Sequence, residues 1–217
     1  VDNTAILSAN NRGLNYGDAL FETIKTSYGK LLFWEDHYFR LMASMRIMRM
    51  EIPMNFTMPF LEQQIKELLT ANKLDSVSSR VKLLVYRNEG GFYLPATNDI
   101  SFVISCSQLE DDFYLLKDGP YEVDLFKDFY MAPNLLSTLK TNNKAIHVVE
   151  SIFSKENKLQ NCLLLNTEKQ VVEALNGNLF LVKGHVIKTP PLADGCLKGV
   201  MRKQIIDILK TFSEYEM

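Results

Sequence analysis

Residues 11–23 are NRGLNYGDALFET, and residues 36–41 are DHYFRL. Residues 19–27 within the first stretch favour a strand, which turns at Tyr28-Gly29 into a second strand over 30–34. Because side chains alternate between the two faces of a strand, we expect Phe21 and Thr23 to lie on one face of a sheet. The stretch therefore predicts a sheet near the N-terminus. Two downstream segments, LKTNN at 139–143 and VEALNGNLF at 172–180, must be considered together with this stretch, because none of the segments is informative alone.

The rest of the chain alternates between helical and strand patterns. Charge and turn residues near 110–120 mark a linker between two subdomains, which we place at 1–108 and 134–217, with a linker and connecting strand at 109–133. Helical spacing of apolar residues predicts helices over 35–48, 58–73 and 142–157 and a last helix opened by Gly199, with Ala145, Ile146, Val149, Ile152 and Phe153 buried in the third. Strands are predicted at 80–86, 100–106, 161–165, 170–173, 179–182 and 186–188.

The composition favours small-molecule chemistry. The chain has 217 residues, enough to bury a core, and a formal net charge of -2 with both signs interspersed. No apolar run approaches the roughly 18 residues that a membrane span needs, and no basic stripe suits a nucleic acid. Cys106, Cys162 and Cys196 have no metal-ligand spacing, which fits a cytoplasmic protein without a metal site. We therefore expect no membrane and no nucleic acid among its partners.

Two charged residues lie in apolar surroundings. Lys140 follows LLSTL at a predicted junction of strand and helix, where partial burial would lower the pKa of its amine and make it a nucleophile for a carbonyl. Taken alone, such a lysine is more often a solvated surface amine. Glu173 lies in a short strand, where a carboxylate is usually exposed or paired with a cation. Alternatively, a buried Glu173 could keep a pyridine nitrogen protonated.

Two segments could bind a phosphate. The planar guanidinium of Arg40 matches phosphate with two parallel hydrogen bonds, although a helix-surface cation is its ordinary role. Residues 197–201, LKGVM, place a glycine before a helix whose first backbone N–H groups suit an anion. His37, His147 and His185 show no metal-ligand spacing, and for His37 helix capping or packing is the ordinary explanation.

Together these segments resemble the class-IV aminotransferases, the fold-type IV pyridoxal-phosphate enzymes. This family includes branched-chain and D-amino-acid aminotransferases and aminodeoxychorismate lyase. The resemblance implies an α+β fold of two small α/β subdomains, with the cofactor in the cleft between them, in a homodimer. The matching residues agree in order and spacing over nearly the whole chain: Arg12-Gly13, Tyr16-Gly17-Asp18, Phe21-Glu22-Thr23, His37-x-x-Arg40-Leu41, Lys140, Glu173, Asn178-Leu179-Phe180, Thr189-Pro190 and Leu197-x-Gly199-Val200-Met201-Arg202.

The resemblance also implies pyridoxal 5'-phosphate as the cofactor and a role for each matched residue. Lys140 would be the catalytic Schiff-base lysine and proton shuttle, Glu173 the partner of the pyridine nitrogen, and Arg40 a phosphate ligand. Family members commonly have Thr where this chain has Met201, so one hydroxyl contact to the phosphate would be lost. The remaining phosphate contacts would come from Leu197, Gly199, Val200 and Met201, and the substrate pocket from Phe21, Thr23, Lys82, Phe92 and Asn178.

The family pattern also extends beyond both ends of this sequence. Members usually have a short strand with an Asn-Gly turn before the position of Val1. They continue past Met217 into strands and a loop that adds phosphate and substrate contacts. We therefore expect this sequence to be part of a longer protein, with the C-terminal subdomain truncated.

The matched residues leave the reaction open. The D-amino-acid enzymes carry an Arg-x-His pair where this chain has Phe92-Tyr93-Leu94, which disfavours that branch. The spacing after Lys140 is closer to the lyases than to the glycine-rich pattern of the branched-chain enzymes. Thr23 and Lys82 also match the lyases, but Phe92 stands where a lyase arginine is expected.

The favoured hypothesis is an aminotransferase that moves an amino group between an amino acid and a 2-oxo acid through a Lys140 Schiff base. The alternative is a 4-amino-4-deoxychorismate lyase that releases pyruvate and 4-aminobenzoate. A catalytically silent binding protein of the same fold is a third hypothesis, suggested by Met201 and the missing ends.

Overall fold

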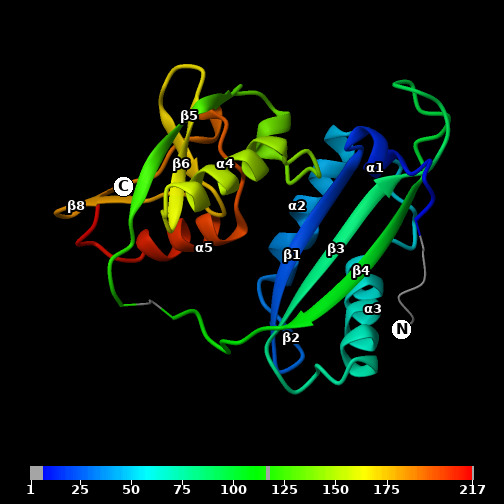
Figure 1. Ribbon diagram of the computed structural model, residues 1–217. Coiled ribbons are helices and arrows are strands. Elements are labelled where there is room, and N and C mark those ends of the chain that lie inside the picture. The colour runs from blue at the N-terminus through cyan, green and yellow to red at the C-terminus, as the bar shows by residue number, and fades with distance from the viewer. Residues whose placement is uncertain (1–6, 116–117, 217) are drawn as a thin grey trace. The chain divides into compact units, whose positions relative to one another are not determined.

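The computed structural model describes residues 7–115 and 118–216, which belong to two units (Figure 1). Unit 1 consists of Val1–Lys117 with Thr141–Asn143, and unit 2 of Asp118–Lys140 with Lys144–Met217. Both units contain helices and strands, which confirms the predicted mixed fold. In the described ranges, no helix has the length and apolar character needed to cross a bilayer. The strand expected before Val1 and the strands and loop expected after Met217 lie outside the described residues.

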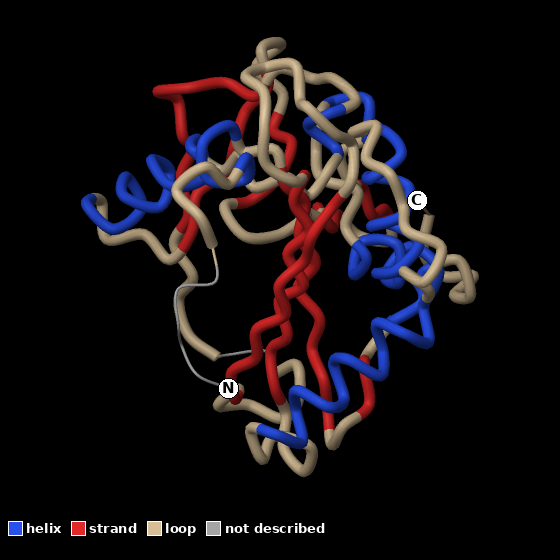
Figure 2. The backbone as a smooth tube through the Cα atoms, turned by 90° about the vertical axis from the view of Figure 1, so that its right-hand side faces the viewer, coloured by secondary structure: helices blue, strands red, loops and turns tan. Residues whose placement is uncertain are grey.

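Unit 1 is built on a four-stranded antiparallel sheet with the order β2-β1-β3-β4. Helices α2 and α3 lie on one face of this sheet (Figures 1 and 2). Alternate β1 residues such as Leu20 and Ile24 are buried on that face, so the strand period of two produces the core. The elements of unit 1 are α1 (Arg12–Tyr16), β1 (Ala19–Ser27), β2 (Lys30–Leu31), α2 (Trp34–Ile47), α3 (Met58–Ala71), β3 (Ser79–Arg87) and β4 (Ile100–Gln108).

A buried ionic cluster lies at the N-terminal end of β1. Asp18 Oδ2 accepts hydrogen bonds from Arg12 Nε at 3.0 Å and from Arg87 Nε at 2.9 Å. Arg12 Nη1 also donates to the carbonyl oxygens of Gly90, at 3.1 Å, and Phe92, at 2.7 Å. Because buried charges are tolerated only with such partners, the cluster ties α1 to β3 and to the loop that follows it.

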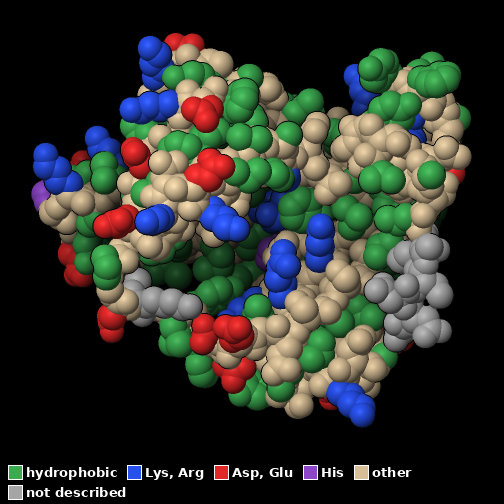
Figure 3. All heavy atoms as spheres, viewed as in Figure 1, with side chains coloured by type: hydrophobic (Ala, Val, Ile, Leu, Met, Phe, Trp, Pro, Cys, Tyr) green, Lys and Arg blue, Asp and Glu red, His purple; other side chains and the backbone are tan. Residues whose placement is uncertain are grey.

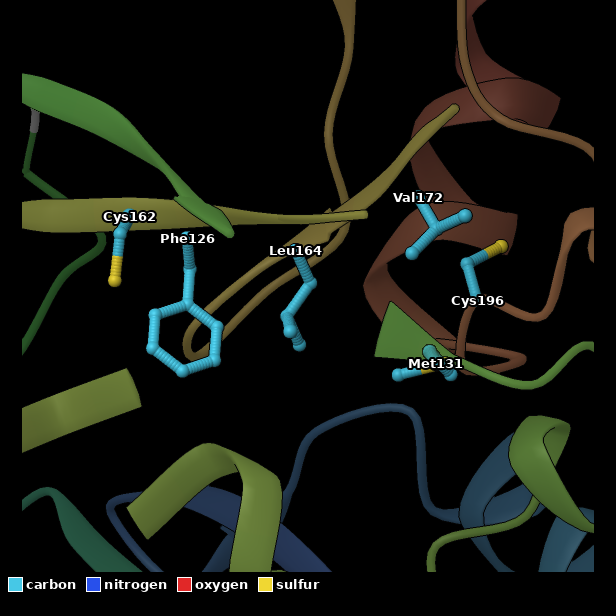
Figure 4. Close-up of a cluster of buried hydrophobic side chains, with 6 residues drawn as sticks. All are labelled: Phe126, Met131, Cys162, Leu164, Val172 and Cys196. Carbon is cyan, nitrogen blue, oxygen red and sulfur yellow. The ribbon is translucent and has the colours of Figure 1, made fainter. Parts of the chain in front are cut away.

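Unit 2 contains a three-stranded sheet of order β5-β6-β7 and a β8-β9 hairpin. Its core is shown in Figure 4, where the side chains of Phe126, Cys162 and Leu164 point to the same side of the sheet. Ile146 and Phe153 of α4 pack against this cluster. The elements of unit 2 are β5 (Val123–Met131), α4 (Ala145–Glu156), β6 (Asn161–Asn166), β7 (Val171–Ala174), β8 (Leu181–Lys183), β9 (Val186–Lys188) and α5 (Val200–Leu209), with 3-10 turns at Leu136–Thr138 and Leu192–Asp194.

Strand β7 carries a bulge beside a charged residue. Leu164 of β6 pairs with Glu173, whereas Leu165 pairs with Val171, so Val172 is the extra residue. In a regular strand, neighbouring side chains point to opposite faces, yet Val172 and Glu173 are 0 % and 5 % exposed. The bulge therefore accompanies the burial of a carboxylate next to a core valine.

The region around Lys140 differs from the prediction. No strand ends there in the described chain; Lys140 follows the 3-10 turn at Leu136–Thr138, and α4 begins only at Ala145. The predicted helical start at 142 is wrong because Asn142 instead donates its N–H to the Ala19 carbonyl oxygen at 2.9 Å. Tertiary pairing with β1 thus replaces the first helical turn.

The buried face of α4 also differs from the prediction. Ala145 is exposed, and Val149 and Ile152 are 38 % and 51 % exposed. The helix instead turns Ile146, Glu150 and Phe153 inward, a set that keeps the spacing of one helical face. The error arose because Glu150 is charged and does not count in an apolar pattern. Helix α1 was not predicted, since its five residues are too few to show periodicity.

Glu150 is fully buried, and its pKa follows from that position. Neither carboxyl oxygen has a hydrogen-bond partner of good geometry in the described part of the chain. Burial raises the pKa of Glu150 to about 7; the Cys162 thiol opposes this rise and the charge of Glu173 adds to it. The folded protein therefore keeps a proton that the unfolded chain releases near pH 4.5. The free energy of unfolding should therefore decrease as the pH rises from about 4.5 to about 7, the pKa of Glu150 in the folded protein.

We expect Glu150→Gln to remove this loss of stability, because an amide stays neutral at every pH. The variant should match the wild type at about pH 4 and exceed it by about 3 kcal/mol at about pH 8 in urea unfolding. Glu156→Gln, at an exposed position of the same helix, is the matched control and should follow the wild type. An unchanged pH dependence in Glu150→Gln would contradict the assignment.

Candidate functional site

Glu173 of β7 is a buried carboxylate held from two sides. Its Oε2 accepts the Leu197 N–H at 2.8 Å, and its Oε1 lies 3.3 Å from His147 Nε2. The side chain is 6 % exposed, so the burial required of a pyridine partner is present. One carboxylate therefore connects α4 to the loop before α5. His147 had no role in the sequence analysis.

The loop before α5 has the geometry of an anion site. Gly199 is the N-cap of α5, and within the described residues no side chain caps the first N–H groups of that helix. A Cβ on Gly199 would lie 1.9 Å from Asn178 Oδ1, and Asn178 Nδ2 donates to the Leu197 carbonyl oxygen at 2.8 Å. Any larger residue at position 199 would therefore require Asn178 to move from this position. The structure thus brings Glu173, Asn178, Leu197 and Gly199 together.

Val200 and Met201 form the first turn of α5. The side chain of Val200 is buried, whereas Met201 is 40 % exposed. At these two positions of a helix the backbone N–H groups have no partner within the helix. Any anion contact here would therefore be made by the backbone, and the methionine thioether adds no strong donor.

The main chain is held on both sides of Lys140. Before it, the Lys198 N–H donates to the Thr138 carbonyl oxygen at 3.1 Å, so the loop of Gly199 is tied to the segment that leads to the lysine. Leu139 is 5 % exposed. After it, Thr141 forms a bridge with Leu20 of β1. A backbone anchored in this way limits where the Lys140 amine can reach.

Arg40 of α2 is bound to a second buried carboxylate, Glu22 of β1. Its Nε donates to Oε1 at 2.8 Å, and its Nη2 donates to Oε2. His37 Nδ1 lies 2.7 Å from Oε2, so His37 belongs to a charged cluster and does not merely cap the helix. Burial raises the pKa of Glu22, but the hydrogen bonds and charges of His37 and Arg40 outweigh it and lower that pKa. The carboxylate is therefore ionised, and it orients the guanidinium.

The predicted pocket residues of unit 1 separate into two groups. Phe21 and Thr23 share the sheet face opposite α2 and α3, as alternation predicted. Lys82 lies on the same face, because it pairs with Thr23 and its Nζ lies 4.9 Å from the centre of the Phe21 ring. Lys and Arg side chains are exposed over β1 and β3 (Figure 3). Phe92 lies on the loop between β3 and β4 and is 83 % exposed.

Comparison with known proteins points to one family. A family model described as amino-transferase class IV matches residues 19–216. A Methanocaldococcus jannaschii protein assigned as a branched-chain-amino-acid aminotransferase is 28 % identical over 206 residues, which cover 95 % of this chain and 70 % of that protein.

Solved structures show the same fold. The 4-amino-4-deoxychorismate lyase from Pseudomonas aeruginosa is similar at a TM-score of 0.76 with 26 % identity, covering 98 % of this chain and 76 % of that chain. The branched-chain amino acid aminotransferase from T.th., complexed with N-(5'-phosphopyridoxyl)-L-glutamate, has a TM-score of 0.81 and 22 % identity, covering 98 % of this chain and 69 % of that chain.

Class IV proteins use pyridoxal 5'-phosphate, and the residues of unit 2 fit that cofactor. Glu173 is a buried carboxylate suited to a protonated ring nitrogen. Gly199 lies against Asn178 without room for a Cβ, at a helix N-terminus that no described side chain caps, which suits a phosphate. Lys140 supplies an amine suited to a carbonyl carbon.

Gly199→Ala should weaken cofactor binding, because a Cβ there displaces either the loop or the Asn178 side chain, whose amide is bonded to the Leu197 carbonyl oxygen. We expect the affinity of the apoprotein for pyridoxal phosphate to fall about tenfold or more, equivalent to about 1.4 kcal/mol. Fluorescence titration measures this change. Gly177→Ala is the matched control, since a Cβ at Gly177 meets nothing within 4 Å. Equal affinity in Gly199→Ala and the wild type would contradict the proposed phosphate loop.

Proposed function

We propose that this chain, which belongs to the amino-transferase class IV family, is an aminotransferase that moves an amino group between an amino acid and a 2-oxo acid. The family is one of pyridoxal-phosphate enzymes. The observation that carries the proposal is the link between Glu173 and Leu197 at 2.8 Å. A buried carboxylate and the backbone of a candidate phosphate loop therefore lie next to each other, and this nearness supports a cofactor that carries both a pyridine nitrogen and a phosphate.

Each residue of the proposed site has a defined task. Bound pyridoxal phosphate draws electrons from the substrate's α carbon and makes its proton acidic. Lys140 would hold the cofactor through its carbonyl carbon, and once the substrate's amine has displaced it, the free Lys140 Nζ would accept the proton of the α carbon and return it. Glu173 holds the proton at the ring nitrogen. The backbone N–H groups of Val200 and Met201 would bind the phosphate, and the role of Arg40 as a phosphate ligand stays a prediction from the family resemblance.

A second candidate function is 4-amino-4-deoxychorismate lyase. The direct pairing of Thr23 with Lys82 favours it, because a hydroxyl and a cation side by side suit an anionic substrate. The similarity to the Pseudomonas aeruginosa lyase supports the same choice. Phe92 supplies no charge for the substrate, so this pocket would use fewer cations than the lyase pattern.

We further propose a homodimer in the cytoplasm. Val148, Val149 and Ile152 of α4 expose 58 %, 38 % and 51 % of their side chains, and apolar patches of this kind mark interaction surfaces. Cys106, Cys162 and Cys196 are free thiols, which suits a reducing compartment.

Lys140→Ala should abolish both the visible absorbance of the bound cofactor and the reaction. We expect the turnover rate to fall about a thousandfold or more, because the group that moves the proton is lost. Lys155→Ala, on the exposed face of α4, is the control and should keep both properties. A wild-type protein that shows no cofactor absorbance would favour a catalytically silent relative instead.

The two candidate reactions give different products. As an aminotransferase, the protein should form glutamate when amino acids are supplied with 2-oxoglutarate. Release of pyruvate from aminodeoxychorismate alone would establish the lyase. Lys82→Met should lower kcat/KM for the anionic substrate about tenfold, because one charge-assisted contact is lost. An unchanged kcat/KM would remove Lys82 from the pocket.

A further inference from the structure

The side chain of His147 lies within hydrogen-bond distance of Glu173, with Nε2 3.3 Å from Oε1. It lies on α4, and its side chain is 21 % exposed. It stands beside the face of α4 that packs on the core, where Ile146 and Phe153 contact the hydrophobic cluster. His147 itself is not part of that hydrophobic cluster. Packing in the core therefore does not account for its contact with Glu173.

Several charged or titratable groups face Glu173. Lys144 is the N-cap of α4, Glu150 lies within α4 as His147 does, and Cys196 comes from the loop before α5. Burial lowers the pKa of Lys144, and the charge of Glu173 opposes that change. None of these three groups is hydrogen-bonded to Glu173 in the described residues. His147 and the Leu197 N–H both contact the carboxylate and so contribute to its orientation.

We propose that His147 is a positioning residue that fixes the carboxylate of Glu173 for the cofactor's ring nitrogen. The inference rests on the proposed function. The terminal torsion of a glutamate is broad, so one donor leaves the carboxylate plane free to turn. A donor on each oxygen, Leu197 N–H on Oε2 and His147 Nε2 on Oε1, defines that plane.

Both contacts also leave acceptor capacity on Glu173. An ionised carboxylate has about four lone-pair sites, and these two partners occupy two of them. A third donor can then be accepted without displacing either partner. His147 thus makes the position of Glu173 independent of whether the cofactor is present, which lowers the cost of ordering at binding.

The test compares three variants of the apoprotein with the wild type in a fluorescence titration with pyridoxal phosphate. His147→Leu removes the donor and should lower the affinity about tenfold. His147→Gln carries an amide N–H at the place of Nε2 and should keep the affinity within about twofold of the wild type. His185→Gln, at a side chain that is 72 % exposed, is the matched control and should change nothing.

A second readout separates positioning from packing. The absorbance spectrum of the bound cofactor should change in His147→Leu and return in His147→Gln, which a purely structural role would not produce. If His147→Leu fails to fold, as judged by circular dichroism, His147→Asn replaces it; its shorter amide should lose the affinity that Gln keeps.

Two outcomes overturn the inference while leaving the proposed function in place. One is a His147→Leu protein that binds pyridoxal phosphate like the wild type, and the other is equal loss in the Leu and Gln variants. A wild-type protein that binds no pyridoxal phosphate overturns the proposed function and this inference with it.

Discussion

Burying an ionised carboxylate costs several kcal/mol unless donors reach its oxygens, and both units of this protein are organised around such groups. Asp18 lies between two arginines, Glu22 between an arginine and a histidine, and Glu173 between a histidine and a backbone N–H. Each carboxylate joins segments that are distant in sequence. Glu150 shows the opposite solution, because a buried carboxyl without donors is more stable when it carries a proton.

Periodicity predicted the elements whose one face meets a core. β1 alternates between buried and half-buried residues as expected, and α3 buries Leu61, Ile65 and Leu69 at helical spacing. Periodicity gave wrong predictions where a contact between residues distant in sequence determines the local structure. The first turn expected for α4 pairs instead with β1, and the bulge at Val172 depends on the register of β7 against β6. Neither contact can be predicted from the residues that are neighbours in the sequence.

The candidate site was predictable to the extent that it follows motifs. Glu173, Asn178, Leu197 and Gly199, which the resemblance named for the cofactor and the substrate, lie together, and Phe21 and Thr23 share a face as alternation implied. The histidines were missed for a physical reason. His37 and His147 bond carboxylates 15 and 26 residues away, and nothing in the composition near a histidine reveals which distant side chain will meet it.

The return of residues 141–143 to unit 1 has a consequence for how the protein is made. Unit 1 is complete only when this segment pairs with Ala19 and Leu20, so its last contacts span more than a hundred positions of the chain. During synthesis, the contacts of residues 141–143 with Ala19 and Leu20 can therefore form only after residues 118–140 of the other unit have been made. A single cut between the units would also leave the sheet without its last segment.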